Sequence, residues 1–103
     1  MNARIDVPSD KIAAFCRRWQ ITELALFGSV LRDDFGPDSD VDVLVGFGEG
    51  AKHTLFDLDD MELELKEIFG RKVDLVSRRG VEASRNYLRR NSILKSAQVI
   101  YGS

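Results

Sequence analysis

The feature that most constrains this chain lies within residues 24–45, where an apolar segment, a Gly-Ser pair and an alternating acidic segment follow one another. Gly28 and Ser29 end the apolar segment, and Asp40 and Asp42 begin an alternation with valines. Because side chains point to opposite faces along a strand, the two carboxylates share one face and the valines share the other. The pattern predicts two strands joined through a glycine turn, with one acidic face and one core face.

The acidic face predicts a bound cation. Two ionised carboxylates held side by side repel each other, and a nearby cation relieves that repulsion. Asp74 adds a third carboxylate, because residues 72–76 alternate as a strand with Val73 and Leu75 on the core side. Carboxylate oxygens suit Mg²⁺, and a glycine-serine turn before a helix offers N–H groups to a phosphate. The combination favours metal-assisted phosphoryl chemistry.

The remaining periodicity predicts an α/β order of elements. Thr54 and Asp57 resemble a capping box at a helix start, and Gly70 is typical of a helix end. Helices would cover the valine face, which leaves the acidic face as an open cleft. We expect helices over 9–19, 30–33, 55–69 and 81–94, strands over 24–27, 40–47 and 72–76, and a final short strand or packed tail over 99–101.

Size and composition predict one domain. The chain has 103 residues and a mass of 11.6 kDa, and it contains no apolar run long enough to span a bilayer. Residues 1–8 lack the basic start and apolar run of a secretory signal, so we expect a cytoplasmic protein without a membrane partner. The single cysteine, Cys16, lies in an apolar helical stripe, where a buried thiol without chemical function is ordinary.

Charge is distributed unevenly along the chain. The formal net charge is −2, yet between Arg71 and Lys95 the only acids are Asp74 and Glu82, against eight Lys and Arg residues. One interpretation is a solvated helix face that balances the acidic remainder of the chain. The other is a basic surface that binds a polyphosphate or an acidic partner.

These motifs together carry a family resemblance. Gly28-Ser29, ten intervening residues, Asp40-Val41-Asp42 and the downstream Asp74 resemble the signature of the DNA polymerase β-like nucleotidyltransferase superfamily. More narrowly, the chain is similar to the minimal nucleotidyltransferases that act as antitoxins, the MNT or MntA proteins. The resemblance covers nearly the whole chain and implies a single minimal nucleotidyltransferase domain over 1–103. The implied fold is a small mixed β-sheet backed by helices on one face, the polymerase β-like palm.

The resemblance also implies roles for residues. Asp40, Asp42 and Asp74 would bind Mg²⁺, with the third also activating the acceptor hydroxyl. The implied set that binds ATP comprises Gly28, Ser29 and Arg32. Asp33 departs from the superfamily, which often has glycine there.

The antitoxin branch implies a reaction and a partner. AMP would pass from ATP to a tyrosine of a HEPN-type ribonuclease toxin, which is thereby silenced. Members of the branch tend to form complexes with the toxin, so a hetero-oligomer is implied and direct nucleic-acid binding is not. Two alternatives remain open: an antitoxin that neutralises its partner by contact alone, and nucleotidyl transfer to a small molecule.

Other interpretations of single residues also remain open. Asp38, Asp40, Asp42 and Glu49 fall at EF-hand positions, although that loop needs glycine where Val43 stands. On a purely structural interpretation, Asp40 caps a turn, Asp42 is an exposed strand residue and Ser29 is a structural cap. His53 has no partner at metal or catalytic spacing, so we expect a surface loop histidine. We expect Tyr87 and Tyr101 to be core or interface aromatics.

Overall fold

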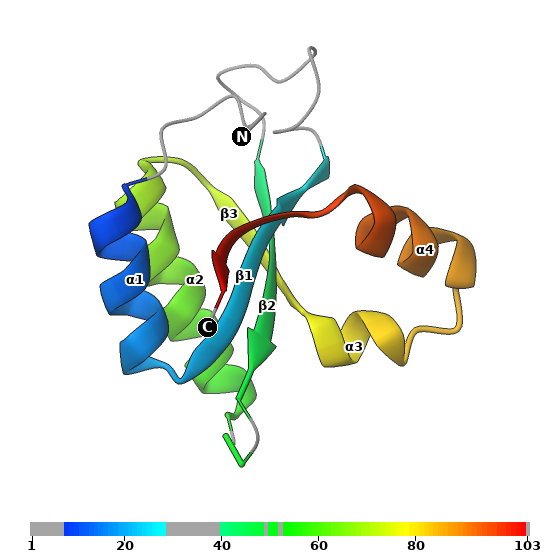
Figure 1. Ribbon diagram of the computed structural model, residues 1–103, viewed down its shortest axis with the longest axis horizontal. Helices are drawn as coiled ribbons and strands as arrows, with labels where there is room; N and C mark the ends of the chain where they lie inside the picture. Colours follow the sequence, from blue (N-terminus) through cyan, green and yellow to red (C-terminus); the bar gives the residue numbers. More distant parts are fainter. Residues whose placement is uncertain (1–7, 29–39, 49, 52, 103) are drawn as a thin grey trace.

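A computed structural model describes residues 8–28, 40–48, 50–51 and 53–102. The four strands form one mixed sheet in the order β3-β2-β1-β4, in which β2 and β3 run parallel and the other pairs antiparallel (Figure 1). The expected small mixed α/β sheet is therefore confirmed. In chain order the elements are α1 (Ser9–Arg18), β1 (Ile21–Phe27), β2 (Val41–Phe47), α2 (Leu55–Phe69), β3 (Val73–Ser77), α3 (Arg78–Glu82), α4 (Tyr87–Ser96) and β4 (Gln98–Gly102).

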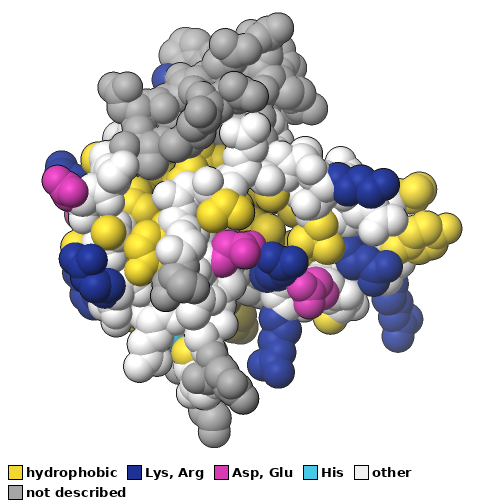
Figure 2. Space-filling model, in the orientation of Figure 1, with side chains coloured by type: hydrophobic (Ala, Val, Ile, Leu, Met, Phe, Trp, Pro, Cys, Tyr) yellow, Lys and Arg dark blue, Asp and Glu magenta, His cyan; other side chains and the backbone are white. Residues whose placement is uncertain are grey.

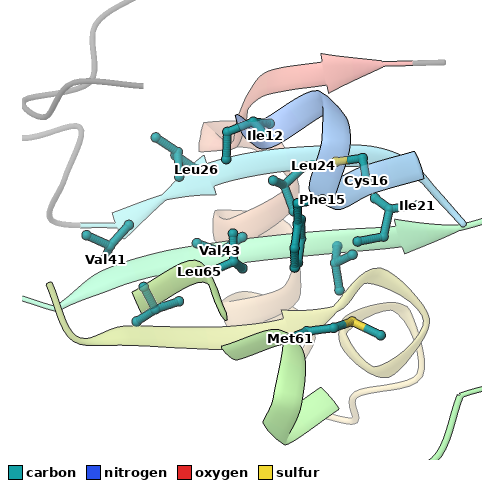
Figure 3. Close-up of a cluster of buried hydrophobic side chains, with 12 residues drawn as sticks. Ile12, Phe15, Cys16, Ile21, Leu24, Leu26, Val41, Val43, Met61 and Leu65 are labelled. Atoms are coloured by element: carbon teal, nitrogen blue, oxygen red, sulfur yellow. The ribbon is translucent and has the colours of Figure 1, made fainter. Parts of the chain in front are cut away.

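The main core lies between the sheet and the helices α1 and α2, which cover the same face of the sheet (Figures 1 and 3). Phe15 of α1 and Met61 and Leu65 of α2 are fully buried there. The strands contribute side chains at alternate positions, as the sequence pattern requires. Those side chains are Leu24, Leu26, Val41, Val43, Val45 and Val73.

The opposite face of the sheet is partly covered as well. Phe27 and Leu44 on that face form a second buried cluster with Val81 of α3 and Ile93 of α4. The prediction of helices on one face is confirmed for α1 and α2, but the acidic face is not an open cleft along its whole length. The cause is visible in residues 24–27 and 43–45, which are apolar without interruption and so bury side chains on both faces.

Helix α2 has the ends that its sequence predicts. The Thr54 side chain accepts a hydrogen bond from the Asp57 N–H at 3.2 Å, and the Asp57 carboxylate accepts one from the Thr54 N–H at 3.0 Å. Gly70 ends the helix in the left-handed conformation, at φ 67°. This helix of 15 residues is the longest that the structure describes, and no helix in the described ranges is long and apolar enough to cross a membrane.

The prediction of one helix over 81–94 is wrong. The structure divides this region into α3 and α4, and each begins with its own cap. Ser77 Oγ accepts a hydrogen bond from the Gly80 N–H at 3.0 Å, and Asn86 Oδ1 accepts one from the Arg89 N–H at 3.2 Å. Short polar side chains at these two positions therefore start two helices where apolar spacing alone suggested one.

The other predicted boundaries differ less from the structure. Strand β1 begins at Ile21 and not at position 24, because its first residues are half-polar and conceal the strand. The C-terminal segment is a strand, β4, which pairs with β1. The short helix expected over 30–33 lies outside the residues that the structure describes.

Candidate active site

Asp42 and Asp74 lie side by side on neighbouring strands. They are register partners in the parallel pair β2 and β3, whose backbones are about 4.8 Å apart in a sheet of this kind. Their neighbours on either side, Val41 with Val73 and Val43 with Leu75, point into the main core, so both carboxylates point to the opposite face. The prediction that carboxylates from two strands share one face is therefore confirmed for Asp42 and Asp74.

Gly28 lies against the Asp42 carboxylate. Phe27, the last residue of β1, is the register partner of Asp42, and Gly28 follows it with a φ of 75°. A Cβ on Gly28 would lie 3.2 Å from Asp42 Cγ and would overlap Oδ2. Glycine is required here twice over, because an L side chain would be strained by the backbone and would displace the carboxylate.

Asp40 lies just before β2, at the same end of the sheet. The Val41 N–H donates a hydrogen bond of 2.9 Å to the Lys72 carbonyl, which fixes the start of β2 beside the start of β3. Asp40 and Asp42 are both half-buried, whereas Asp74 is exposed. The structure thus places the three predicted carboxylates at the same end of the parallel pair β2 and β3.

Two predicted site residues cannot be placed. Ser29 and Arg32, together with the unusual Asp33, lie outside the described residues, and their roles stay predictions. The EF-hand interpretation is wrong on other grounds, since its loop would span 38–49. Most of that span is the regular strand β2, whose extended backbone cannot wrap around a calcium ion.

The carboxylates at this end of the sheet suit Mg²⁺ better than a metal ion whose ligands all come from the protein. Among the residues that the structure describes, no three His, Cys, Asp or Glu side chains are grouped closely enough to hold a metal ion. Mg²⁺ does not need such a cage, because it keeps several waters and binds through one or two carboxylates together with substrate phosphates. Asp40 and Asp42 could supply this kind of partial site, and Asp74 lies beside Asp42 on the neighbouring strand.

A pocket of about 280 Å³ lies farther along the same face, between β3 and the helices α3 and α4. Val76 of β3 and Ile93 of α4 contribute apolar walls, and Arg89 and Arg90 contribute charge. Asp74 and Val76 are two positions apart on one strand, so the pocket continues the acidic face. The sequence signal for this pocket was the basic segment, whose placement depends on the break between α3 and α4.

His53 lies in a loop before α2, as predicted, but its side chain packs inward and not on the surface. Its side chain is only 12% exposed, and its ring lies 4.4 Å from the Phe47 ring and 6.0 Å from that of Trp19, centroid to centroid. His53 Nε2 is also hydrogen-bonded to the Trp19 carbonyl at 2.9 Å. These contacts join α1, the end of β2 and the segment before α2, far from the paired aspartates. They are structural, and the separation in sequence concealed them.

Cys16 and the two tyrosines lie apart from the paired aspartates. Cys16 is fully buried in the main core, and burial raises the pKa of its thiol to about 12. The expected burial of this thiol is thus confirmed. Tyr101 packs against the main core, but Tyr87 is 59% exposed at the start of α4.

Comparison with known proteins identifies the family. The family model of the nucleotidyltransferase domain matches residues 9–100. Protein adenylyltransferase MntA of Thermococcus cleftensis is 35% identical over 66 residues, which are 64% of this chain and 65% of that protein. This chain therefore spans slightly less than two thirds of that relative.

Solved structures share the fold. A minimal nucleotidyltransferase structure is 36% identical, with a TM-score of 0.67 and coverage of 87% of this chain and 86% of the other. The complex of tri-AMPylated Shewanella oneidensis HEPN toxin with MNT antitoxin has a TM-score of 0.62 at 18% identity, over 92% of this chain and 70% of the other. That second likeness shows the fold alone. On the match of its family model, this chain belongs to the nucleotidyltransferase domain family.

Proposed function

We propose that this protein is an antitoxin that transfers AMP from ATP to a tyrosine of a HEPN-type toxin, with Mg²⁺ as cofactor. The observation that carries the proposal is the register pair of Asp42 and Asp74, with Gly28 packed against the first carboxylate. Relatives support the choice of reaction and partner, since one is named protein adenylyltransferase MntA and another is an MNT antitoxin with an AMPylated HEPN toxin.

In the proposed reaction, the triphosphate and the acceptor lie at different strands of the sheet. The acceptor oxygen attacks the α-phosphorus of ATP, the bond between the α-phosphorus and its bridging oxygen breaks, and pyrophosphate leaves. Mg²⁺, held by Asp40 and Asp42 with the substrate phosphates, would neutralise the charge that develops on the phosphate oxygens. Gly28 follows the last residue of β1, where a backbone without a Cβ leaves room for the Asp42 carboxylate, and the triphosphate would lie on this side of the site.

Asp74 is the residue for the acceptor side. It lies on β3, the edge strand, and its side chain is exposed, so an incoming hydroxyl group can reach it. A carboxylate beside the acceptor can take the proton of the attacking hydroxyl as the new bond forms. Ser29 and Arg32 complete the proposal as phosphate contacts.

The test is a mass measurement on the acceptor. A purified HEPN toxin is incubated with ATP, Mg²⁺ and either the wild type or Asp42→Asn, with Asp59→Asn on the exposed face of α2 as the matched control. We expect mass gains in steps of one AMP with the wild type and the control, and none with Asp42→Asn. Equal silencing of the toxin by wild type and Asp42→Asn without any mass gain would instead establish neutralisation by contact.

A further inference from the structure

The surface of α3 and α4 carries a positive charge that the residues of these two helices do not balance. Residues 78–96 contain six Lys and Arg residues and one acid, Glu82. That acid is already engaged, because Glu82 Oε1 accepts a hydrogen bond of 2.8 Å from Arg78 Nε. Arg78 also binds Glu23 at 2.6 Å, and these partners raise its pKa above the ordinary value. Arg78 is therefore neutralised within the protein.

Three other arginines of this surface are available to a partner. The guanidinium groups of Arg79, Arg85 and Arg89 make no ion pair or hydrogen bond with any residue in the described part of the chain. Figure 2 shows the Lys and Arg side chains gathered over α3 and α4. Such a cluster stabilises a bound acidic group and repels another cation.

Apolar side chains lie within this basic surface. Tyr87 is 59% exposed and Leu88 is 74% exposed at the start of α4, next to Arg89. The pocket against β3 is apolar at Val76 and Ile93, and Arg90 is held at its edge by a hydrogen bond of 3.2 Å to the Glu82 carbonyl. An exposed aromatic and apolar centre within a charged rim is the composition of a protein interface.

The position of this surface, next to the acceptor side of the candidate site, indicates which partner it binds. The candidate site runs across the sheet from Gly28 at the end of β1, through Asp42 on β2, to Asp74 on β3. In the proposed function, on which this inference rests, the triphosphate lies at the first and the acceptor at the last. Val76 in the pocket is two residues beyond Asp74 on the same face, about 7 Å along the strand.

We propose that the α3 and α4 surface, with its pocket against β3, is the docking site for the acceptor protein. It takes an acidic segment that presents an aromatic side chain. Arg79, Arg85 and Arg89 bind the acidic side chains, and the apolar pocket holds the aromatic one near Asp74. A nucleic acid fits less well, because a short acidic segment meets only this basic surface, whereas a long polyanion would also meet the acidic remainder of a chain whose net charge is −2.

Binding of a labelled random copolymer of glutamate and tyrosine to the metal-free protein tests the proposal, with polyglutamate and a lysine-tyrosine copolymer beside it. We expect the glutamate-tyrosine copolymer to bind most tightly, and Arg89→Glu to weaken that binding at least tenfold. The matched control is Arg17→Glu, an exposed arginine of α1, which should change it less than twofold. Leu88→Ser should weaken binding about threefold, whereas Leu63→Ser, another exposed leucine, should not.

Two results would overturn the docking site. One is an equal loss with Arg17→Glu and Arg89→Glu, which would mean attraction by overall charge. The other is tighter binding of polyuridylate RNA than of the glutamate-tyrosine copolymer, which would assign the surface to nucleic acid. Binding of ATP with Mg²⁺ is measured separately in each variant. Its absence in the wild type would contradict the proposed function and leave the outcome of the copolymer test valid.

Discussion

Asp42 and Asp74 are register partners on two parallel strands, although 32 positions separate them in the sequence. Helix α2 makes this pairing possible, because parallel strands need a long crossover between them. The crossover buries Met61 and Leu65 against the same sheet, so the packing of α2 fixes the relative height of β2 and β3. The hydrophobic core thus positions two carboxylates that would repel each other in isolation.

Asp74→Asn should separate nucleotide binding from transfer. Because Asp74 lies on the acceptor side, we expect its amide variant to bind ATP with Mg²⁺ within about threefold of the wild type. The rate of AMP transfer should fall by roughly 100-fold or more, the range for loss of a general base. Isothermal titration and a transfer assay on the same sample measure the two. Equal losses of binding and rate would instead place Asp74 among the nucleotide ligands.

Gly28→Ala should abolish ATP binding, an effect that backbone strain alone does not explain. Alanine at a φ of 75° is strained, and its Cβ would also displace the Asp42 carboxylate. Gly70→Ala is the matched control, because Gly70 has a φ of 67° and nothing within 4 Å of the added Cβ. Both variants should lose about 1 kcal/mol of stability. Only Gly28→Ala should lose ATP binding, and retention of binding would show that Asp42 can move without consequence.

The central strands and the shared face of the carboxylates could be predicted because alternation is a local signal. Val41, Asp42 and Val43 set the faces of β2, and Val73, Asp74 and Leu75 set those of β3 without reference to distant residues. The glycine turn could be predicted in the same way, since Gly28 interrupts an apolar strand. Local patterns therefore sufficed for the central strands and for one edge of the site.

What could not be predicted depends on contacts distant in sequence. His53 packs on Trp19 and Phe47, and no local pattern marks such a partnership. The uninterrupted apolar residues 24–27 indicate that the second face of the sheet is also covered. Which helices cover it depends on the break before α4, which no local pattern placed. The pocket beside β3 exists only because that break lets Ile93 and Val81 meet the same sheet.

Thr54→Ala should destabilise the protein by about 1 kcal/mol, the usual cost of losing a cap. The Thr54 side chain satisfies the Asp57 N–H at the start of α2, which would otherwise lack a partner. Ser9→Ala is the control, since no side chain caps the start of α1. Urea titration of both variants measures the difference. Equal destabilisation would mean that the capping box contributes nothing specific to α2.

Stability at alkaline pH should depend on Cys16. Burial raises the pKa of its thiol from 9.0 to about 12, so the folded protein retains a proton that the unfolded chain releases. Between those values the unfolded state binds fewer protons, and the free energy of unfolding therefore falls as the pH rises.

Thermal melts of the wild type and Cys16→Ala should therefore differ in slope between pH 9 and pH 11. The wild type should lose stability more steeply there, although the variant is less stable at neutral pH because it leaves a small cavity in the main core. The thiol should also react with iodoacetamide at pH 8 only after addition of urea, since the side chain is fully buried. Parallel pH profiles for the two proteins, or rapid labelling of the folded protein, would contradict this placement of Cys16.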